Sequence, residues 1–504
     1  MIKSLFKSFG YKTVQTVVLT LYSVLLIPIL LNYWELKVYG AWIALFTVFN
    51  LIQVIEFGHA TYIGNQFNAI VKENAEKAKT VLGSALRANF ITGFIQITIV
   101  FLLFKSGFLK FLLDTDISDK TIATVLTILF LYRMLAGSFR GIIVKTLNPF
   151  GLIYKSFQFA TWERIIDFFI LVIAAITDIT LIQLAIVWFV VKSVYSIGLL
   201  FILKRLLPDF FPWWKYGNFK LGTENFKDSI PFIFSNFLER LRNDGVVLII
   251  SAFIGTTFLP LFVATRAVVN FGLKISEIIL NPLSPEVINL YVKNKLNKIL
   301  DIFNAYWFST GLLLISGYSI SLFFINDLFT FWTHGKLTFN LGLYSALAVI
   351  FLIQNYGKII FTFFTAINKS KLVLTTSFLR VLIFFSVAFA SMQYGLYGIV
   401  LAMFFSELLV NAFWLPYHSF TVFSIKKSNK FLYLLNLCAV LFVAMLFYLN
   451  YVGTSFWVLI LLSTLLPLFY YYQYRGISKT TRFLLLNSLK GIPVFPLNKK
   501  KNVK

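Results

Sequence analysis

Charged side chains inside a long apolar stretch are the residues of this sequence best suited to chemistry. Residues 229–252 form such a stretch and contain Glu239, Arg240, Arg242 and Asp244. On a helix, Arg240 can meet Asp244 four residues on, and Arg242 can meet Glu239 three residues back. The alternative is that the arginines bind an anionic ligand, because an unpaired charge at membrane depth needs water or a ligand.

Arg266 is a different kind of candidate, because no acidic residue lies three or four positions from it. It lies about ten residues, or roughly 15 Å, into the next apolar stretch, near the middle of a bilayer. Its guanidinium could hold a phosphate in a bidentate geometry that lysine does not offer. Lys274 could also contact such a ligand, although Glu277 three residues on can pair with it.

Further ionisable residues in the apolar stretches extend the candidate site. Four cations could line a passage for an anionic substrate: Arg133, Lys192, Lys358 and Arg380. Four acids could bind a proton or sodium ion that couples transport to a gradient: Glu56, Asp167, Asp244 and Glu407. Neutralising pairs that lock two helices are the alternative, and the sequence does not choose between them.

Other chemistries have weaker support. Asp114-Thr115-Asp116 is an acidic motif of the kind that binds a metal or activates an acceptor in membrane glycosyltransferases, but a solvated loop is the favoured interpretation. His59, His334 and His418 are too scattered to form a zinc site. Cys438 is the only cysteine, which excludes an intrachain disulfide, and we expect it to be a buried small hydrophobe.

Composition predicts the elements that hold these residues. The chain has 504 residues, of which 59% are hydrophobic and 13% charged, and its mean hydropathy is +0.82. Its apolar runs are long enough to span a bilayer as helices and lack the alternation of barrel strands. We therefore predict an all-α polytopic membrane protein with about fourteen transmembrane helices, at 13–33, 40–62, 86–106, 120–138, 158–178, 181–203, 229–252, 256–281, 303–325, 339–366, 371–392, 395–416, 431–450 and 455–474.

Charge decides how the spans are counted and oriented. The net charge is +25, but the basic residues lie between apolar runs rather than along one soluble face, so nucleic acid is not expected as a partner. An even number of spans with a cytoplasmic N-terminus places most lysines and arginines inside. This bias favours two spans broken near Gly255 and Pro260 over one continuous span, and it places both termini in the cytoplasm.

The longest basic loop divides the predicted helices into groups. We expect an N-terminal six-helix bundle at 1–203 and a basic cytoplasmic linker at 204–228. A C-terminal six-helix bundle follows at 229–416, and two extra transmembrane helices and a basic cytoplasmic tail occupy 417–504. Such duplication is common in transporters, whose substrate site lies between the repeats.

Two passages resemble the Wzx-like polysaccharide flippases, which belong to the superfamily that contains the MATE multidrug exporters. The first has the markers Val38-Tyr39-Gly40-Ala41-Trp42 and Glu56-Phe57-Gly58, with glutamate where the family usually has aspartate. The second is GTTFLPLFVATRAVVNF at 255–271, followed by NPLSPEV, with Leu261 at a position where tyrosine is common. Gly40 and Gly58 are expected to allow close helix approach or a turn at a span end.

The resemblance implies two bundles that open alternately around a cationic central cavity. The substrate it implies is an undecaprenyl-pyrophosphate-linked oligosaccharide for O-antigen, capsule or exopolysaccharide assembly in the bacterial inner membrane. We therefore expect a transporter and not an enzyme, without a cofactor other than possible coupling to a proton or sodium gradient. Expected partners are membrane lipids, a polysaccharide polymerase and a chain-length regulator.

Two other functions remain as alternatives. A MATE-like cation or drug exporter is the first, and a membrane glycosyltransferase or polymerase is the second. The excess of arginine and lysine within the predicted spans favours an anionic substrate over the cations of drug exporters.

Overall fold

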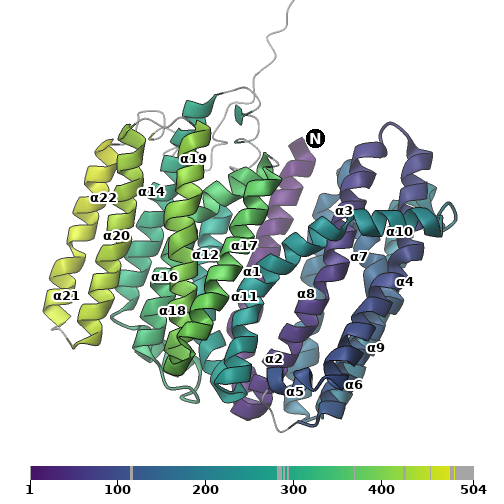
Figure 1. The fold of residues 1–504 in the computed structure, drawn as a ribbon, viewed down its shortest axis with the longest axis horizontal. Coiled ribbons are helices and arrows are strands. Elements are labelled where there is room, and N and C mark those ends of the chain that lie inside the picture. The colour runs from purple at the N-terminus through teal and green to yellow at the C-terminus, as the bar shows by residue number, and fades with distance from the viewer. Residues whose placement is uncertain are drawn as a thin grey trace, which may run out of the picture. The chain divides into compact units, whose positions relative to one another are not determined.

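The computed structural model describes residues 2–113, 117–280, 287, 290–291, 295–367, 369–423, 427–453, 456–476 and 482. All regular elements in these residues are helices, and Figure 1 shows the long helices of the chain. Ten of the described helices are long and apolar enough to cross a membrane. The predicted fold class, an all-α polytopic membrane protein, is confirmed. The motif Asp114-Thr115-Asp116, most of 281–287 and nearly all of the basic tail beyond 476 lie outside the described residues.

The chain is organised into two compact units. Unit 1 comprises Met1–Ala264, Trp332–Thr338 and Met392–Ile399, and unit 2 comprises Thr265–Phe331, Phe339–Ser391 and Val400–Lys504.

Unit 1 is built from the following helices: α1 (Ile2–Tyr33), α2 (Leu36–Ile52), α3 (Val54–Ile70), α4 (Ala75–Lys105), α5 (Phe108–Leu113), α6 (Asp119–Tyr132), the π-helix η1 (Arg133–Gly137), α7 (Ser138–Lys145), α8 (Ile153–Ile176), α9 (Leu181–Leu206), α10 (Phe219–Asp228) and α11 (Ile230–Phe253). It also contains three short 3₁₀ helices: η2 (Asn148–Phe150), η3 (Pro208–Phe210) and η4 (Thr256–Phe258).

Helix α12 (Leu259–Leu280) begins in unit 1 and continues into unit 2. The helices that follow are α14 (Leu296–Ser321), α15 (Ile325–Trp332), α16 (Leu341–Ala366), α17 (Ser370–Ala390), η5 (Met392–Tyr394), α18 (Gly395–Glu407), the π-helix η6 (Leu408–Trp414), α19 (Leu415–Phe423), α20 (Lys427–Tyr451), α21 (Phe456–Ser463) and α22 (Leu465–Gly476).

Several helices begin directly after a residue whose side chain caps the N-terminus of the helix. Asn74, Ser118 and Asn340 each accept a hydrogen bond from a backbone N–H in the first turn of α4, α6 and α16. Thr180 forms a capping box with Gln183 at the start of α9. These caps satisfy N–H groups that have no partner within the helix.

A break between α11 and α12 falls where the sequence predicts it. Gly255 has φ +113°, a conformation that side-chain-bearing residues rarely adopt, and Pro260 lies in the first turn of α12. The predicted division near Gly255 and Pro260 is therefore confirmed. Each of the fourteen predicted spans overlaps a helix or a run of helices, but α8, α11, α20 and the pair α21 and α22 are not among the ten segments that are long and apolar enough to cross a membrane. The total of fourteen crossings stays a prediction.

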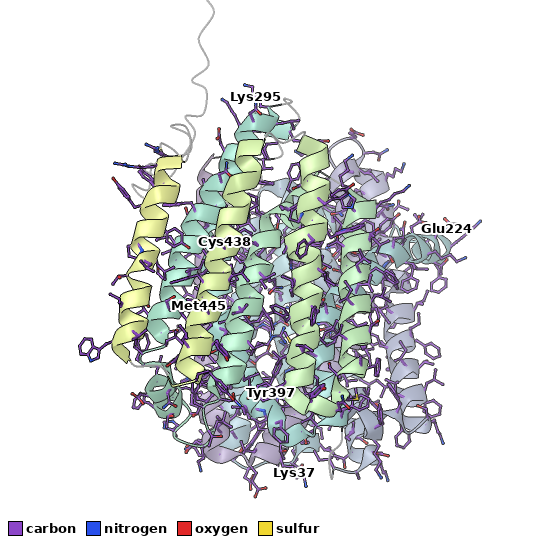
Figure 2. The ribbon with its side chains drawn as sticks, turned by 60° about the vertical axis from the view of Figure 1, so that its left-hand side comes forward. Lys37, Glu224, Lys295, Tyr397, Cys438 and Met445 are labelled. Carbon is purple, nitrogen blue, oxygen red and sulfur yellow. The ribbon has the colours of Figure 1, made fainter. Side chains whose placement is uncertain are left out.

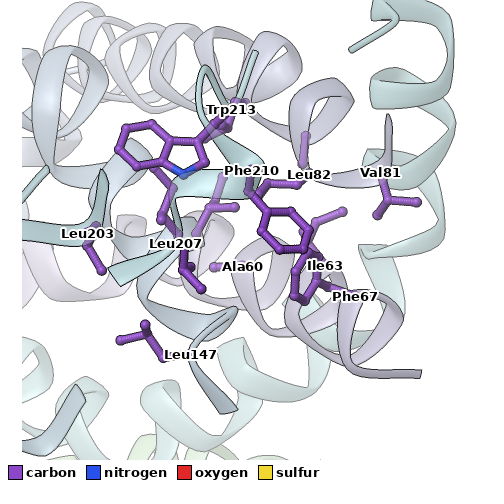
Figure 3. Close-up of a cluster of buried hydrophobic side chains, with 14 of the residues drawn as sticks. Ala60, Ile63, Phe67, Val81, Leu82, Leu147, Leu203, Leu207, Phe210 and Trp213 are labelled. Carbon is purple, nitrogen blue, oxygen red and sulfur yellow. The ribbon is translucent and has the colours of Figure 1, made fainter. Parts of the chain in front are cut away.

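The segment predicted as a linker at 204–228 is packed into unit 1. Phe210 and Trp213 belong to a buried apolar cluster with residues of α3, α4 and α9 (Figure 3). Asn218 donates its backbone N–H to Ser84 Oγ at 2.8 Å, and α10 lies across α3 and α4 (Figure 1). The boundary between the compact units does not coincide with this segment, because α11 packs against α2 and α3 of unit 1.

Cys438 is exposed, so the prediction that it is a buried small hydrophobe is wrong. It lies on α20, where Figure 2 labels it together with Met445. Cys438, Leu441, Met445 and Tyr448 form an exposed stripe at helical spacing, whereas Ala439, Val440, Val443, Leu446 and Phe447 are buried. In a membrane helix the outward face meets lipid, so an apolar residue need not be buried to avoid water.

Gly40 and Gly58 hold helices of unit 1 close together, as the sequence predicts. A Cβ atom at Gly40 would collide with the carbonyl oxygen of Thr256 in η4, and one at Gly58 would lie 2.5 Å from Ile233 Cα of α11. No side chain larger than hydrogen fits at either contact without movement of a backbone.

We predict that Gly58→Ala lowers the stability of the protein by about 1–3 kcal/mol, the usual cost of overpacking. The matched control is Gly198→Ala within α9, where an added Cβ meets nothing within 4 Å. This control should be neutral or should stabilise by up to about 1 kcal/mol, since alanine favours helix more than glycine. Thermal unfolding of the purified protein measures both, and equal melting temperatures for the two variants would contradict the close contact.

Candidate functional site

A buried charge network connects α7, α8 and α9 in unit 1. Arg140 binds Glu163 through two hydrogen bonds of 2.7 Å each. Lys192 Nζ lies 2.9 Å from Glu163 and 2.8 Å from Asp167. Arg164 Nη1 lies 3.7 Å from Asp167. The two carboxylates therefore hold three cations, and the sequence predicted only Lys192 and Asp167 as site residues.

A second buried pair of unit 1 joins α3 to the π-helix η1. Arg133 Nε donates to Glu56 Oε2 at 2.8 Å, and Arg133 Nη2 donates to Glu56 Oε1. The two residues are 5% and 2% exposed. Gly137 and Gly141 lie against this pair, because a Cβ at Gly137 would be 3.0 Å from the Arg133 guanidinium and one at Gly141 would be 3.3 Å from Glu56 Oε1.

Unit 2 contains a comparable group between α17 and the end of α18. Arg380 Nη2 donates to Asn411 Oδ1 at 2.5 Å, and Asn411 Nδ2 donates to Glu407 Oε2. Arg380 Nε lies 3.9 Å from Glu407 Oε2. Asn411 belongs to the π-helix η6 and lies against Gly357 of α16, where no Cβ would fit. Asn411 thus bridges the two charges.

The charges of α11 are paired along the helix but are more exposed. Arg240 lies 3.3 Å from Asp244, and Arg242 lies 3.2 Å from Glu239, which are the two pairs that helical spacing predicts. The side chain of Arg240 is 43% exposed, against 6% for Arg133. Arg240 and Asp244 are therefore open to solvent or ligand in a way that the buried pairs are not.

The remaining predicted cations lie in unit 2. Lys358 of α16 pairs with Glu277 of α12 at 2.7 Å, and both side chains are partly exposed. Lys274 lies one turn before Glu277 on the same helix, and Lys274 and Arg266 are both half-buried. The eight predicted cations therefore do not form one cluster within either unit. Four belong to each: Arg133, Lys192, Arg240 and Arg242 in unit 1, and Arg266, Lys274, Lys358 and Arg380 in unit 2.

Burial separates these groups into two kinds. Arg133, Lys192 and Arg380 are at most 5% exposed and contact carboxylates on other helices. A charge in this setting is neutralised by its partner, and removing either member leaves an uncompensated buried charge. Exposed charges such as Arg240 can instead meet water or an anionic ligand, because hydrocarbon would not solvate them.

Sequence reasoning missed Arg140, Glu163, Arg164 and Asn411. Arg140 lies between the spans predicted at 120–138 and 158–178, and α7 continues through it. Glu163 and Arg164 lie within the span predicted at 158–178 but were not singled out as site residues. Their signal was present, since Glu163, Arg164 and Asp167 follow one another at helical spacing in an apolar stretch. Asn411 carries no charge and gave no signal.

The helices, their apolar surfaces and their internal charges define a polytopic membrane protein. No protein-family profile matches the chain, and no curated protein sequence matches it. Its fold is similar to those of several solved membrane transporters. A multidrug resistance MATE transporter in an inward-facing conformation aligns with a TM-score of 0.62 and 14% identity, over 82% of this chain and 99% of that one.

Two further structures have the same fold. Lipid II flippase MurJ in an inward closed conformation aligns with a TM-score of 0.59 and 13% identity, over 94% of this chain and 99% of that one. A MOP superfamily transporter from Pyrococcus furiosus, described as having a binding pocket of reverse polarity, aligns with a TM-score of 0.54 and 14% identity. That alignment covers 84% of this chain and 97% of the archaeal one.

We predict that the Glu56–Arg133 pair is structural. Arg133→Met alone and Glu56→Met alone should each cost about 3–5 kcal/mol, because each leaves one buried charge uncompensated. The double variant should recover most of that loss, since two apolar side chains replace the pair. Melting temperature and the yield of monodisperse protein measure the effect.

Glu76→Met is the matched control for this pair. Glu76 pairs with Lys79 at 2.7 Å, but its side chain is 67% exposed, so its loss should cost less than about 1 kcal/mol. A double variant no more stable than the single variants would show that the pair has another role. Retained export by a stable double variant would exclude Arg133 from substrate binding and Glu56 from ion coupling.

Proposed function

We propose that this chain is a flippase that moves undecaprenyl-pyrophosphate-linked oligosaccharide repeat units across the bacterial inner membrane by alternating access. The observation that carries the proposal is the extent of the fold that it shares with lipid II flippase MurJ. That alignment covers 94% of the chain, against 82% for the inward-facing MATE transporter. The difference between these two coverages corresponds to about 60 of the 504 residues, which is similar in length to the passage from α20 to α22.

The charge of the membrane-embedded helices supports an anionic substrate. Sugars and pyrophosphate cannot cross hydrocarbon unaided, so a hydrated passage with cationic side chains lowers the barrier while the lipid tail stays in the bilayer. Arg240 is an exposed cation of the required type, and half-buried Arg266 and Lys274 are further candidates. The side chain of Asp244 is 24% exposed, against at most 8% for those of Glu56, Asp167 and Glu407, so Asp244 is the most accessible of the four acids proposed for ion coupling.

The location and partners follow from the same proposal. The lysine and arginine bias favours cytoplasmic N- and C-termini. The product would enter O-antigen, capsule or exopolysaccharide assembly, so a polysaccharide polymerase and a chain-length regulator are the proposed partners. A proton or sodium gradient is the proposed energy source.

A MATE-like exporter of cations or drugs is the second candidate. It is favoured by the TM-score of 0.62 with a MATE transporter, against 0.59 with the lipid II flippase. A membrane glycosyltransferase or polymerase is the third.

Deletion of this chain, followed by analysis of lipid-linked sugars, tests the proposal. We predict that the deletion strain accumulates complete repeat units on the cytoplasmic side, because assembly continues while translocation stops. Mass spectrometry of the lipid extract measures the repeat units, and the same strain with the gene restored is the control.

The other outcomes identify the alternatives. Normal glycan with altered drug tolerance would contradict the flippase and favour the exporter. Incomplete repeat units would contradict it and favour the transferase.

A further inference from the structure

We propose that Arg164 is the exposed end of a phosphate-binding subsite in unit 1. The subsite rests on the proposed function for its ligand, a phosphate group of the lipid-linked substrate. Arg164 is not among the cations that the sequence predicted, and its role follows from the charge and exposure of the network that it terminates.

The network carries one excess positive charge. Arg140, Lys192 and Arg164 face two carboxylates, Glu163 and Asp167, with N···O distances from 2.7 to 3.7 Å. An uncompensated charge within a membrane is costly, so an arrangement with three cations and two acids favours the arrival of an anion.

Glu56 does not supply the missing negative charge. Both of its carboxylate oxygens accept hydrogen bonds from Arg133, so that pair is neutral by itself. Within the residues that the structure describes, Asp167 is the single acid paired with Arg164.

Arg164 is also the member of the network that an external ligand can reach. Its side chain is 45% exposed, whereas those of Arg140 and Lys192 are 8% and 2% exposed. Its distance of 3.7 Å from Asp167 is longer than a hydrogen bond. The N–H donors of its guanidinium are therefore available for a bidentate contact with a phosphate.

Arg164 lies near the middle of α8. It is the twelfth of the 24 residues of α8, so about 17 Å of helix separates it from either end. Helix α8 packs between α1 and α9, and both of these contain candidate membrane spans. An exposed guanidinium among apolar helices needs water or a ligand.

The exposed apolar face of α8 lies on the opposite side of the helix. Trp162, Phe169, Ile173 and Ile176 are each more than half exposed and recur at helical spacing, which is typical of a lipid-facing stripe. Arg164 follows Trp162 by two residues, or about 200° around the helix. The guanidinium therefore does not project from this apolar stripe.

Binding of inorganic pyrophosphate to the purified protein in neutral detergent tests the subsite. We expect pyrophosphate to raise the melting temperature of the wild-type protein in a saturable manner. Arg164→Gln should weaken the apparent affinity at least tenfold, because it removes the charge and the paired donors. Arg164→Lys should retain part of the affinity, since it keeps the charge without the bidentate geometry.

Arg205→Gln is the matched control, because it removes the same charge from an exposed position in the last turn of α9. It should bind pyrophosphate as the wild type does. Equal affinity in Arg164→Gln and the wild type, or no binding by the wild type, would overturn the subsite. If Arg164→Gln does not fold, the Arg164→Lys protein is titrated with pyrophosphate instead. An affinity equal to that of the wild type would then overturn the bidentate contact.

A second arm identifies the source of the phosphate. The same titration is made in nanodiscs of phosphatidylcholine and in nanodiscs that contain phosphatidylglycerol. Equal pyrophosphate affinity in both supports a substrate phosphate, whereas loss of the response with phosphatidylglycerol would overturn that source and assign the subsite to a membrane lipid headgroup.

This test separates the subsite from the proposed function. Arg164-dependent binding in a protein whose deletion leaves lipid-linked sugars unchanged would contradict the flippase and keep the subsite. Accumulated repeat units in the deletion strain, with no binding at Arg164, would contradict the subsite alone.

Discussion

The cost of placing charge in a low-dielectric membrane governs how this protein is built. Each ionised group within the helices must have a counter-charge, water or a ligand. The structure uses the first solution at Glu56 and Arg133, which are almost fully buried and bind each other through two hydrogen bonds. It leaves Arg164 and Arg240 partly exposed, so these groups depend on water or ligand. The division between paired and exposed charges separates groups that hold helices together from groups that can recognise a substrate.

In each unit, a buried acid and a buried cation on consecutive helices pair with each other. The helix that carries the acid in one unit corresponds to the helix that carries the cation in the other. In unit 1 an acid of α8, Asp167, meets a cation of α9, Lys192. In unit 2 a cation of α17, Arg380, meets an acid at the end of α18, Glu407, with Asn411 between them. These helices correspond to the fifth and sixth predicted spans of each predicted half. Each pair is neutral whichever of its two helices carries the acid. Both pairs can therefore hold their helices together, although the residue types at the two positions differ.

The sequence predicted features that depend on local geometry. Periodicity and hydropathy predicted the helical membrane fold, and Gly255 and Pro260 marked the break between α11 and α12. The pairs on α11 followed from helical spacing, since their members lie three and four residues apart.

Contacts between helices could not be predicted in this way. Glu56 and Arg133 are 77 residues apart, and nothing in either local sequence identifies the other as its partner. Glu163 lies within the span predicted at 158–178, but nothing in its local sequence identifies Arg140 and Lys192 as its partners. Cys438 was assigned to the interior by a rule for soluble proteins, although a membrane helix tolerates an apolar residue on its outer face.

We propose that the exposed cations serve the translocation of an anionic lipid-linked sugar. Reconstitution of the purified protein into vesicles with a polyprenyl-pyrophosphate-linked oligosaccharide tests it most directly, with the accessibility of the sugar to a membrane-impermeant oxidant as the readout. We expect the protein to make the inner-leaflet pool accessible over time, whereas protein-free vesicles keep that pool protected. Equal protection with and without the protein, in vesicles that nevertheless transport a cationic drug, would rule out this role for the exposed cations.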